Sequence, residues 1–164
     1  MKYFLFLIIA ISAATAIGVK SKENKVAEDE SLKVSENYNA KLAQELGADD
    51  YGMKMYVMAL LKQGPNRDHS PEEAAKLQKA HMDNIKRMAE SGELVLAGPF
   101  AKNDQGIQGI YIFDVKTVEE AEALTSSDPA IKAGRLKMEL IPWYGSAALL
   151  KVTEIGKTIA KKSF

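Results

Sequence analysis

The sequence of 164 residues contains no cysteine, one tryptophan and two histidines, and its 22 basic side chains balance its 22 acidic ones. Without cysteine there is no disulfide and no residue to carry a lipid anchor, so the apolar core alone must hold the fold. The balanced charge argues against a nucleic-acid partner, which usually shows a basic excess or a basic stripe. Two histidines without cysteine make a poor set of metal ligands. We therefore expect no metal.

Several enzyme motifs are also absent. The sequence has no GxGxxG or P-loop between a strand and a helix, no HExxH and no G-x-S-x-G, so we expect no cofactor and see no activated nucleophile. Hydrophobic residues make up 46% of the chain. A chain of this length suits one domain and can bury an adequate core.

The pattern of residues 1–16 predicts a cleavable signal peptide. Lys2 is followed by an apolar run from Tyr3 to Ile11, and Ala14-Thr15-Ala16 has the small-x-small pattern that a signal peptidase reads. The apolar segment is shorter than the roughly 20 residues of a membrane-spanning helix, and an uncleaved anchor is the alternative. We expect a secreted or periplasmic protein, cut after Ala16, that has no membrane attachment once the signal is removed.

Residues 17–52 predict a polar linker and a short N-terminal helix. The stretch from Lys20 to Glu36 is rich in charge and too poor in apolar residues to bury a core. From Asn37 to Leu46 a short helix is expected, ended by Gly47. This helix either docks on the following domain or is disordered.

A domain is expected at residues 53–145, beginning with a central strand and a long helix. The apolar run from Met55 to Leu61 is typical of a strand covered on both faces. Ser70 and Glu73 form an S-x-x-E capping box with Pro71 at the first helical position, and Gly92 is the expected helix end.

The remaining pattern completes the element order β-α-β-β-α-β. Strands are expected at residues 93–100, 107–115 and 136–141, and a second helix is expected from the T-x-x-E box at Thr117, ending before Pro129. Pro142-Trp143-Tyr144-Gly145 is expected to end the last strand. This order predicts an α+β ferredoxin-like fold with a four-stranded antiparallel sheet and both helices on one face.

The other face of this sheet must also be covered, because the first strand is apolar on both sides. A second copy of the chain is the expected cover, giving a homodimer of the dimeric α/β barrel type. Residues 146–164 predict a C-terminal extension, in which residues 149–155 form an added edge strand or a docking helix and residues 157–164 form a frayed tail.

Two residues stand out as candidates for chemistry. His81 lies in the middle of the apolar stripe of the first helix, where an ionisable side chain is unusual. A buried helix histidine is more often structural, and His81→Leu would then be tolerated if its partner stays solvated. Asp128 precedes Pro129, a pattern typical of an N-cap. His69 lies in a polar loop and is expected to be solvated.

The span from about Tyr56 to Trp143 resembles the YCII-related proteins. The matching pieces are His81 on the first helix, the S-G-E-L-V-L-A-G-P-F turn and strand, the stretch from Thr125 to Ala133 with its Asp128-Pro129, and the final strand running into Pro142-Trp143. The resemblance implies a dimeric ferredoxin-like domain in which His81 and Asp128 form a catalytic pair in a cleft. At least one such relative is a dehydrochlorinase acting on a chlorinated hydroxyquinol, and most members have no known activity.

These features predict an exported enzyme of lyase or isomerase type that acts on a small cyclic or phenolic compound. A carboxylate beside an imidazole fixes its tautomer and stabilises its protonated form, which suits proton transfer near neutral pH. Arg67, Arg135 and Pro99 are the expected substrate-binding residues. Two alternatives remain open: a non-catalytic module that binds a small ligand in the same cleft, and an envelope protein whose N-terminal helix and tail bind another protein.

Overall fold

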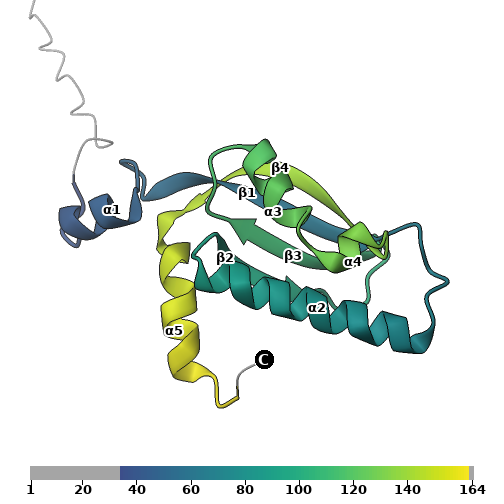
Figure 1. Ribbon diagram of the computed structural model, residues 1–164. Coiled ribbons are helices and arrows are strands. Elements are labelled where there is room, and N and C mark those ends of the chain that lie inside the picture. Colours follow the sequence, from purple (N-terminus) through teal and green to yellow (C-terminus); the bar gives the residue numbers. More distant parts are fainter. Residues whose placement is uncertain (1–33, 163–164) are drawn as a thin grey trace, which may run out of the picture. The chain divides into compact units, whose positions relative to one another are not determined.

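The computed structural model describes residues 34–162 (Figure 1). The predicted signal peptide and residues 20–33 of the predicted linker lie outside the described residues. Residues 34–38 belong to a separate N-terminal unit, and the second unit begins at Asn39. The elements of this second unit are α1 (Ala40–Leu46), β1 (Met53–Gln63), α2 (Pro71–Glu90), β2 (Leu94–Pro99), β3 (Ile107–Phe113), α3 (Val118–Thr125), α4 (Pro129–Lys132), β4 (Leu136–Ser146), η2 (Ala147–Lys151) and α5 (Val152–Ile159). Within the described part of the chain, no helix is long and apolar enough to cross a membrane.

The four strands form one antiparallel sheet in the order β2-β3-β1-β4. β1 lies in the interior of this sheet because its apolar run can be buried on both faces. β2 and β4 are the two edges, and the sheet of the single chain is open and not closed into a barrel. The α+β ferredoxin-like fold predicted from the sequence is confirmed.

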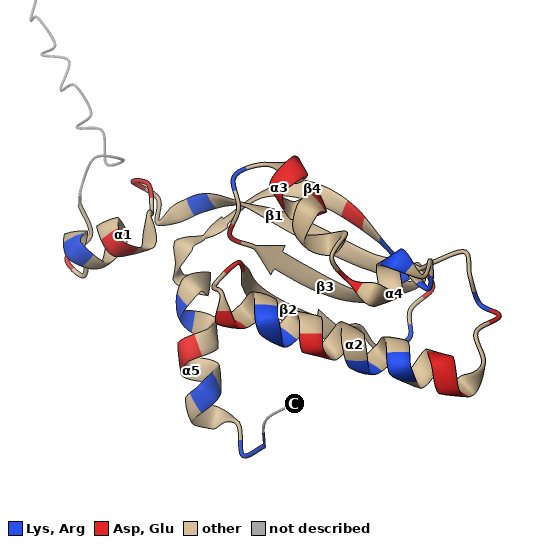
Figure 2. Ribbon diagram, viewed as in Figure 1, with Lys and Arg blue, Asp and Glu red and all other residues tan. Residues whose placement is uncertain are grey.

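Two capped helices cover one face of the sheet (Figure 1). Ser70 and Glu73 form the predicted capping box of α2, and Thr117 and Glu120 form that of α3. Gly92 adopts a positive φ of 82° just after α2, as an αL end requires. The outward side of α2 carries basic and acidic residues along its length (Figure 2). Its inward side packs on the core, which consists of Val57, Ala59, Leu61, Met88, Leu94, Tyr111, Phe113 and Ala121.

β4 continues beyond the point where the sequence predicted its end, so that prediction is wrong. Pro142 lies opposite Val57 within the ladder, which extends to the pair of Met53 with Ser146. A proline has no N–H to donate, but an edge strand needs such donors only on one side. Because β4 is an edge strand, the turn signal of Pro142 does not break it.

The second face of the sheet is partly covered by the C-terminal extension. Tyr56, Val95 and Ile112 are buried there, and Leu149 and Leu150 of η2 pack against them. Of the two forms predicted for residues 149–155, the helical one is confirmed. The chain stays helical to Ile159, so the predicted frayed tail begins later than expected.

Gly64 directly follows β1 in the chain, and its backbone contacts the segment that leads into β4. Its N–H donates to the carbonyl of Arg135 over 2.9 Å. A Cβ added at Gly64 would overlap the carbonyl oxygen of Gly134, whereas one added at Gly98 would meet open space. The close backbone approach at Gly64 therefore excludes any side chain.

We expect Gly64→Ala to destabilise the protein by about 3 kcal/mol, because a rigid backbone carbonyl must move to admit the methyl group. Gly98→Ala is the matched control and should stay within about 1 kcal/mol of wild type. Urea unfolding of both variants measures the difference. Equal midpoints would show that the two segments can separate at no cost.

Candidate active site

α2 positions His81 on the buried side of the helix. The helix starts at the Ser70 cap. His81, Asn84 and Met88 are its buried residues, and their spacing of three and four residues places them on one side of the helix. Only 6% of His81 is exposed. The sequence predicted the burial of His81. It did not predict that of Asn84, because a polar side chain gives no signal of burial.

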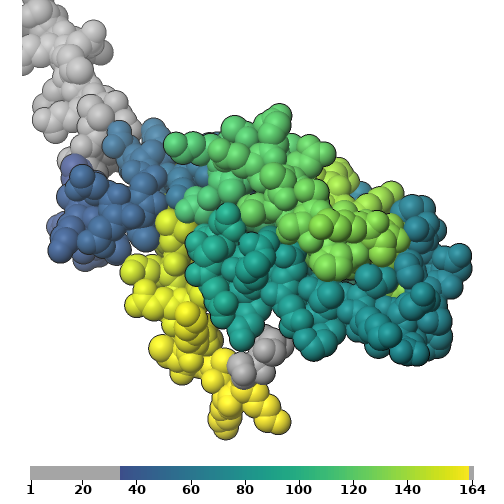
Figure 3. Space-filling model, viewed as in Figure 1, coloured from purple at the N-terminus to yellow at the C-terminus, as the bar shows by residue number. Residues whose placement is uncertain are grey.

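Asp128 is the N-cap of the short helix α4 and is completely buried. One carboxylate oxygen, Oδ1, accepts the amide of Ala130 over 2.8 Å. The other, Oδ2, lies 2.6 Å from Nδ1 of His81. Asp128 therefore caps α4 and pairs with His81 at the same time, because each interaction uses a different carboxylate oxygen. The segments carrying the two residues lie side by side, since α2 contacts α4 (Figure 3).

Tyr111 is a third member of this site that the sequence did not single out. Its hydroxyl lies 3.2 Å from Nε2 of His81, and the two rings stack with centroids 6.2 Å apart. Tyr111 is on β3, on the same face of the sheet as Phe113, and only 2% of it is exposed. The alternation of β3 places Tyr111 on the helix-covered face, which is the one signal that could have found it.

The two contacts of the His81 ring assign its tautomer. The carboxylate of Asp128 accepts a hydrogen bond from Nδ1–H of His81. In the neutral imidazole, Nε2 therefore carries no proton and accepts a hydrogen bond from the Tyr111 hydroxyl. Burial by itself raises the pKa of Asp128, but the hydrogen bond and charge of His81 and the amides of Ala130 and Ile131 outweigh it, so the pKa lies below its ordinary value. Burial and the charge of Asp128 raise the pKa of Tyr111. Asp128 is therefore ionised and Tyr111 neutral at pH 7.

A polar clamp holds α2 against the segment just before Asp128. Asn84 Oδ1 accepts hydrogen bonds from Arg87 over 3.0 Å and from the Ser127 hydroxyl over 3.2 Å. Arg87 also donates to the Ser127 hydroxyl over 3.2 Å. Because Ser127 directly precedes Asp128, this clamp helps to set the position of the carboxylate relative to His81.

The model of the YCII-related domain matches residues 55–144, more than half of the chain, and this span includes His81, Tyr111 and Asp128. The chain belongs to the YCII-related family. No curated protein matches it. Among solved structures, the 5-chloro-2-hydroxyhydroquinone dehydrochlorinase of Burkholderia phenoliruptrix AC1100, in complex with 2,5-dihydroxybenzoquinone, is 16% identical and gives a TM-score of 0.39. The match covers 55% of this chain and 93% of the dehydrochlorinase.

This YCII-related domain does not bring the three predicted substrate-binding residues together. Arg67 donates from Nη1 to the backbone carbonyl of Arg135 over 3.1 Å, so these two lie side by side near the start of β4. Pro99 is exposed on β2, the opposite edge of the sheet. Within residues 34–162, none of the three hydrogen-bonds to the His81–Asp128 pair.

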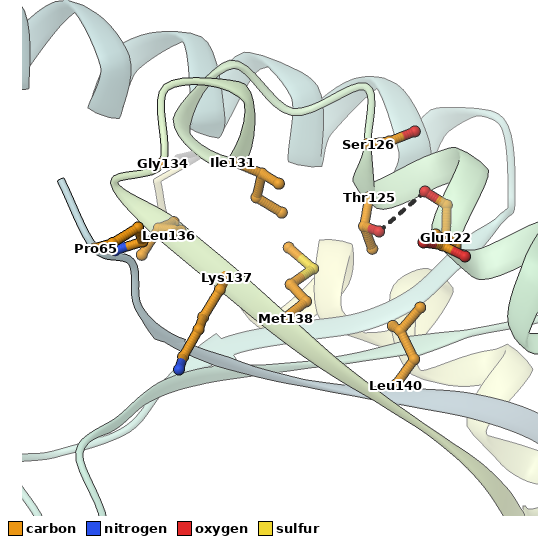
Figure 4. A pocket seen from close by; sticks show the side chains of 10 residues that line it. All are labelled: Pro65, Glu122, Thr125, Ser126, Ile131, Gly134, Leu136, Lys137, Met138 and Leu140. Atoms are coloured by element: carbon orange, nitrogen blue, oxygen red, sulfur yellow. Dashed lines mark hydrogen bonds between the residues drawn. The ribbon is translucent and has the colours of Figure 1, made fainter.

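Two cavities flank α4 in the YCII-related domain. The first, of about 390 Å³, lies between α3, α4 and β4 (Figure 4), and the side chains of Ile131, Leu136, Met138 and Leu140 give it an apolar lining beside Thr125. The second measures about 290 Å³ and is lined by His69, Glu73, Lys76, Leu77 and Ala133. His81, Asp128 and Tyr111 line neither of these two cavities, and all three side chains are buried. Among the described residues, no group of three or more histidine, aspartate or glutamate side chains is arranged to hold a metal ion.

Proposed function

We propose that this YCII-related protein is an enzyme that moves a proton on a small cyclic or phenolic compound, in a reaction of lyase or isomerase type. The observation that carries the proposal is the buried contact of 2.6 Å between Nδ1 of His81 and Oδ2 of Asp128. A buried and ionised carboxylate orients the imidazole and stabilises the imidazolium that forms when the ring takes up a proton.

The direction of the hydrogen bonds assigns a role to each nitrogen. Nδ1 is held protonated by Asp128, so Nε2 is the basic nitrogen that accepts a proton from the substrate, directly or through the Tyr111 hydroxyl. The imidazolium then returns that proton, to another atom of the substrate in an isomerisation or to a departing group in an elimination. No covalent intermediate is needed.

A non-catalytic binding module is the second candidate. It is favoured by the burial of His81 and by the engagement of both its ring nitrogens, since a proton donor or acceptor must be reached by its substrate. Turnover separates the two candidates. Lactones and halogenated phenols are suitable trial substrates, and a reaction that needs both His81 and Asp128 supports the enzyme, whereas tight binding without turnover supports the binding module.

We also propose that two copies of the chain pack through the part of the second sheet face that η2 leaves open. Met58 and Ile110 are half-buried on this face, and Ile141, paired with Met58 across β1 and β4, is 38% exposed. A stable pair needs a total interface of at least about 1,000 Å², and an apolar sheet face is suited to supply it.

We expect Ile141→Lys to convert this dimer into a monomer, because a lysine would have to be buried without a partner. Met82→Lys is the matched control: Met82 has the same exposed fraction of 38% but lies on α2, away from that face. Light scattering at micromolar concentration gives the mass of each variant. A wild-type monomer, or a dimer that survives Ile141→Lys, would contradict the proposed assembly.

We propose, finally, that the protein is exported and cut after Ala16. The support is the sequence pattern of Lys2, the apolar run and Ala14-Thr15-Ala16. In the native host, the mature chain is expected outside the cytoplasm with Ile17 at its start. N-terminal sequencing of the fractionated protein checks this, and a soluble cytoplasmic pool that begins at Met1 or Lys2 would contradict it.

A further inference from the structure

The outer edge of β4 carries backbone groups that no other strand of the described chain pairs. In an antiparallel ladder, successive residues of a strand bond alternately to one side and to the other. The amide of Gly64 donates to the carbonyl of Arg135, in register with the β1–β4 ladder, so Arg135 and every second residue after it face β1. Leu136, Met138 and Leu140 therefore direct their N–H and C=O groups outward, away from the sheet.

This unpaired stretch of β4 has a defined end on each side. Pro142 also faces outward by the same alternation, but it has no N–H to donate. At the other end, the carbonyl of Gly134 accepts the Asn66 amide over 2.9 Å, and the Gly134 amide donates to the Ile131 carbonyl over 2.8 Å. Met138 lies midway between Gly134 and Pro142 in the sequence. An antiparallel pairing of this stretch with its own copy therefore uses all of the free groups only when it is centred on Met138.

The charges beside Met138 complement each other in that register. Lys137 lies opposite Glu139 of the second copy, and Glu139 lies opposite its Lys137. Opposite charges directly across two strands stabilise the pairing, whereas like charges destabilise it. Both side chains are exposed, and in the part of the chain that the structure describes Lys137 has no carboxylate within ion-pair distance. An edge that is protected against pairing commonly carries lysine without such a complement; this edge is self-complementary.

The opposite face of the same stretch is apolar. Leu136, Met138 and Leu140 line the cavity of about 390 Å³ between α3, α4 and β4, and Lys137 points away from it (Figure 4). All three apolar side chains are only half-buried. Centred on Met138, the pairing places Leu136 opposite Leu140 of the second copy, so apolar contacts form on this face while ion pairs form on the other.

We infer that β4 pairs edge to edge with β4 of a second copy of the chain, antiparallel and centred on Met138. The interface is isologous, because the same residues serve both copies. It is separate from the dimer proposed through the second face of the sheet, and it does not depend on the proposed enzymatic activity. A short pair of strands is only marginally stable in water, so we expect a dissociation constant of about 1 mM for this contact.

Amide hydrogen exchange of the wild-type protein distinguishes this pairing from association through the sheet face. In dilute protein, the amides of Lys137 and Glu139, which face β1, should exchange slowly, and those of Leu136, Met138 and Leu140 should exchange fast. At about 1 mM, the exchange of the latter three should slow by about twofold, because about half of the chains are paired. Unchanged exchange of these three amides would overturn the inference, even if the protein associates in another way.

Charge-reversal variants test the register. Lys137→Glu and Glu139→Lys each place like charges opposite one another in the self-pair, so each variant should have a dissociation constant at least about fivefold larger than that of wild type. An equimolar mixture of the two variants restores opposite charges at both positions and should associate at least as strongly as wild type. Lys102→Glu, in the exposed hairpin loop between β2 and β3, is the matched control and should associate as wild type does.

Sedimentation equilibrium up to about 1 mM gives the dissociation constants. Single variants that associate as wild type does, a mixture that stays dissociated, or a wild-type mass that does not rise above its micromolar value would each overturn the inference.

Discussion

Asp128→Asn is expected to leave the protein folded and to lower turnover by about 10²–10⁴-fold, the usual contribution of a general acid–base group. The cap survives because the asparagine oxygen can still accept the Ala130 amide, as Oδ1 of Asp128 does. What changes is the group that faces His81. An amide nitrogen there donates a hydrogen bond, whereas the carboxylate oxygen accepts one.

The imidazole must respond by exchanging its tautomer. In the variant, Nδ1 loses its proton and accepts the asparagine amide, while Nε2 becomes protonated and donates to the Tyr111 oxygen. Both contacts of the ring are kept, but the buried Tyr111 hydroxyl proton loses its acceptor, so the free energy of unfolding should fall by about 1–3 kcal/mol. The basic nitrogen now points at the introduced asparagine and not at Tyr111, so the variant cannot accept a proton on the substrate side.

Three measurements check this prediction: turnover, a thermal melt, and the ¹⁵N shifts of the His81 ring, which report the protonated nitrogen. Asp104→Asn, in the exposed hairpin loop between β2 and β3, is the control for loss of one negative charge. An unchanged tautomer, or turnover equal to wild type, would contradict the assigned role of Asp128.

The stability of the two proteins should also differ in its dependence on pH. Because the pKa of Asp128 is lowered in the folded state, its carboxylate contributes stability that is present above the ordinary aspartate value of about 3.9 and is lost as the pH falls through the lower, folded-state value. The asparagine of the variant cannot ionise. Below about pH 4, wild type should therefore lose stability more steeply than Asp128→Asn, as urea unfolding at a series of pH values would show.

His81→Leu is expected to destabilise the protein by about 3–5 kcal/mol at pH 7, because it leaves the carboxylate of Asp128 buried without its partner. The sequence predicted that this substitution would be tolerated if the partner stayed solvated, but Asp128 is completely buried. The cost should shrink as the pH falls, since protonation of Asp128 removes the unpaired charge.

The double variant His81→Leu with Asp128→Asn is the matched control for that prediction. An asparagine caps α4 without a charge, so the double variant should recover most of the stability that His81→Leu loses. Urea unfolding of the single and double variants gives the coupling free energy of the two residues. A coupling near zero would show that Asp128 is not held by His81.

The helix starts of this protein were predictable because they depend on neighbouring residues. Ser70 with Glu73, and Thr117 with Glu120, satisfy backbone amides within three residues, so the same bonds form whatever lies around them. The Asp128 cap before Pro129 is equally local. Errors occurred where a local signal was overruled, as at Pro142, which ends no strand because β4 is at an edge of the sheet.

Tyr111 and Asn84 were not predicted for the opposite reason. Neither residue belongs to a local sequence motif. Each hydrogen-bonds to a residue that is distant in the chain: Tyr111 and His81 are 30 positions apart, and Asn84 and Ser127 are 43 positions apart.

The sequence by itself determined the order of the elements, their caps and the presence of an ionisable His81 on a buried stripe, since these follow from periodicity and from contacts within a turn of chain. Only the tertiary structure decided that Asp128 caps α4 with one oxygen and holds His81 with the other. That arrangement depends on the packing of α2 against α4, which brings together residues 47 positions apart. Local preferences are read along the chain, whereas the chemistry of this site arises from groups that meet only when the sheet and its helices pack.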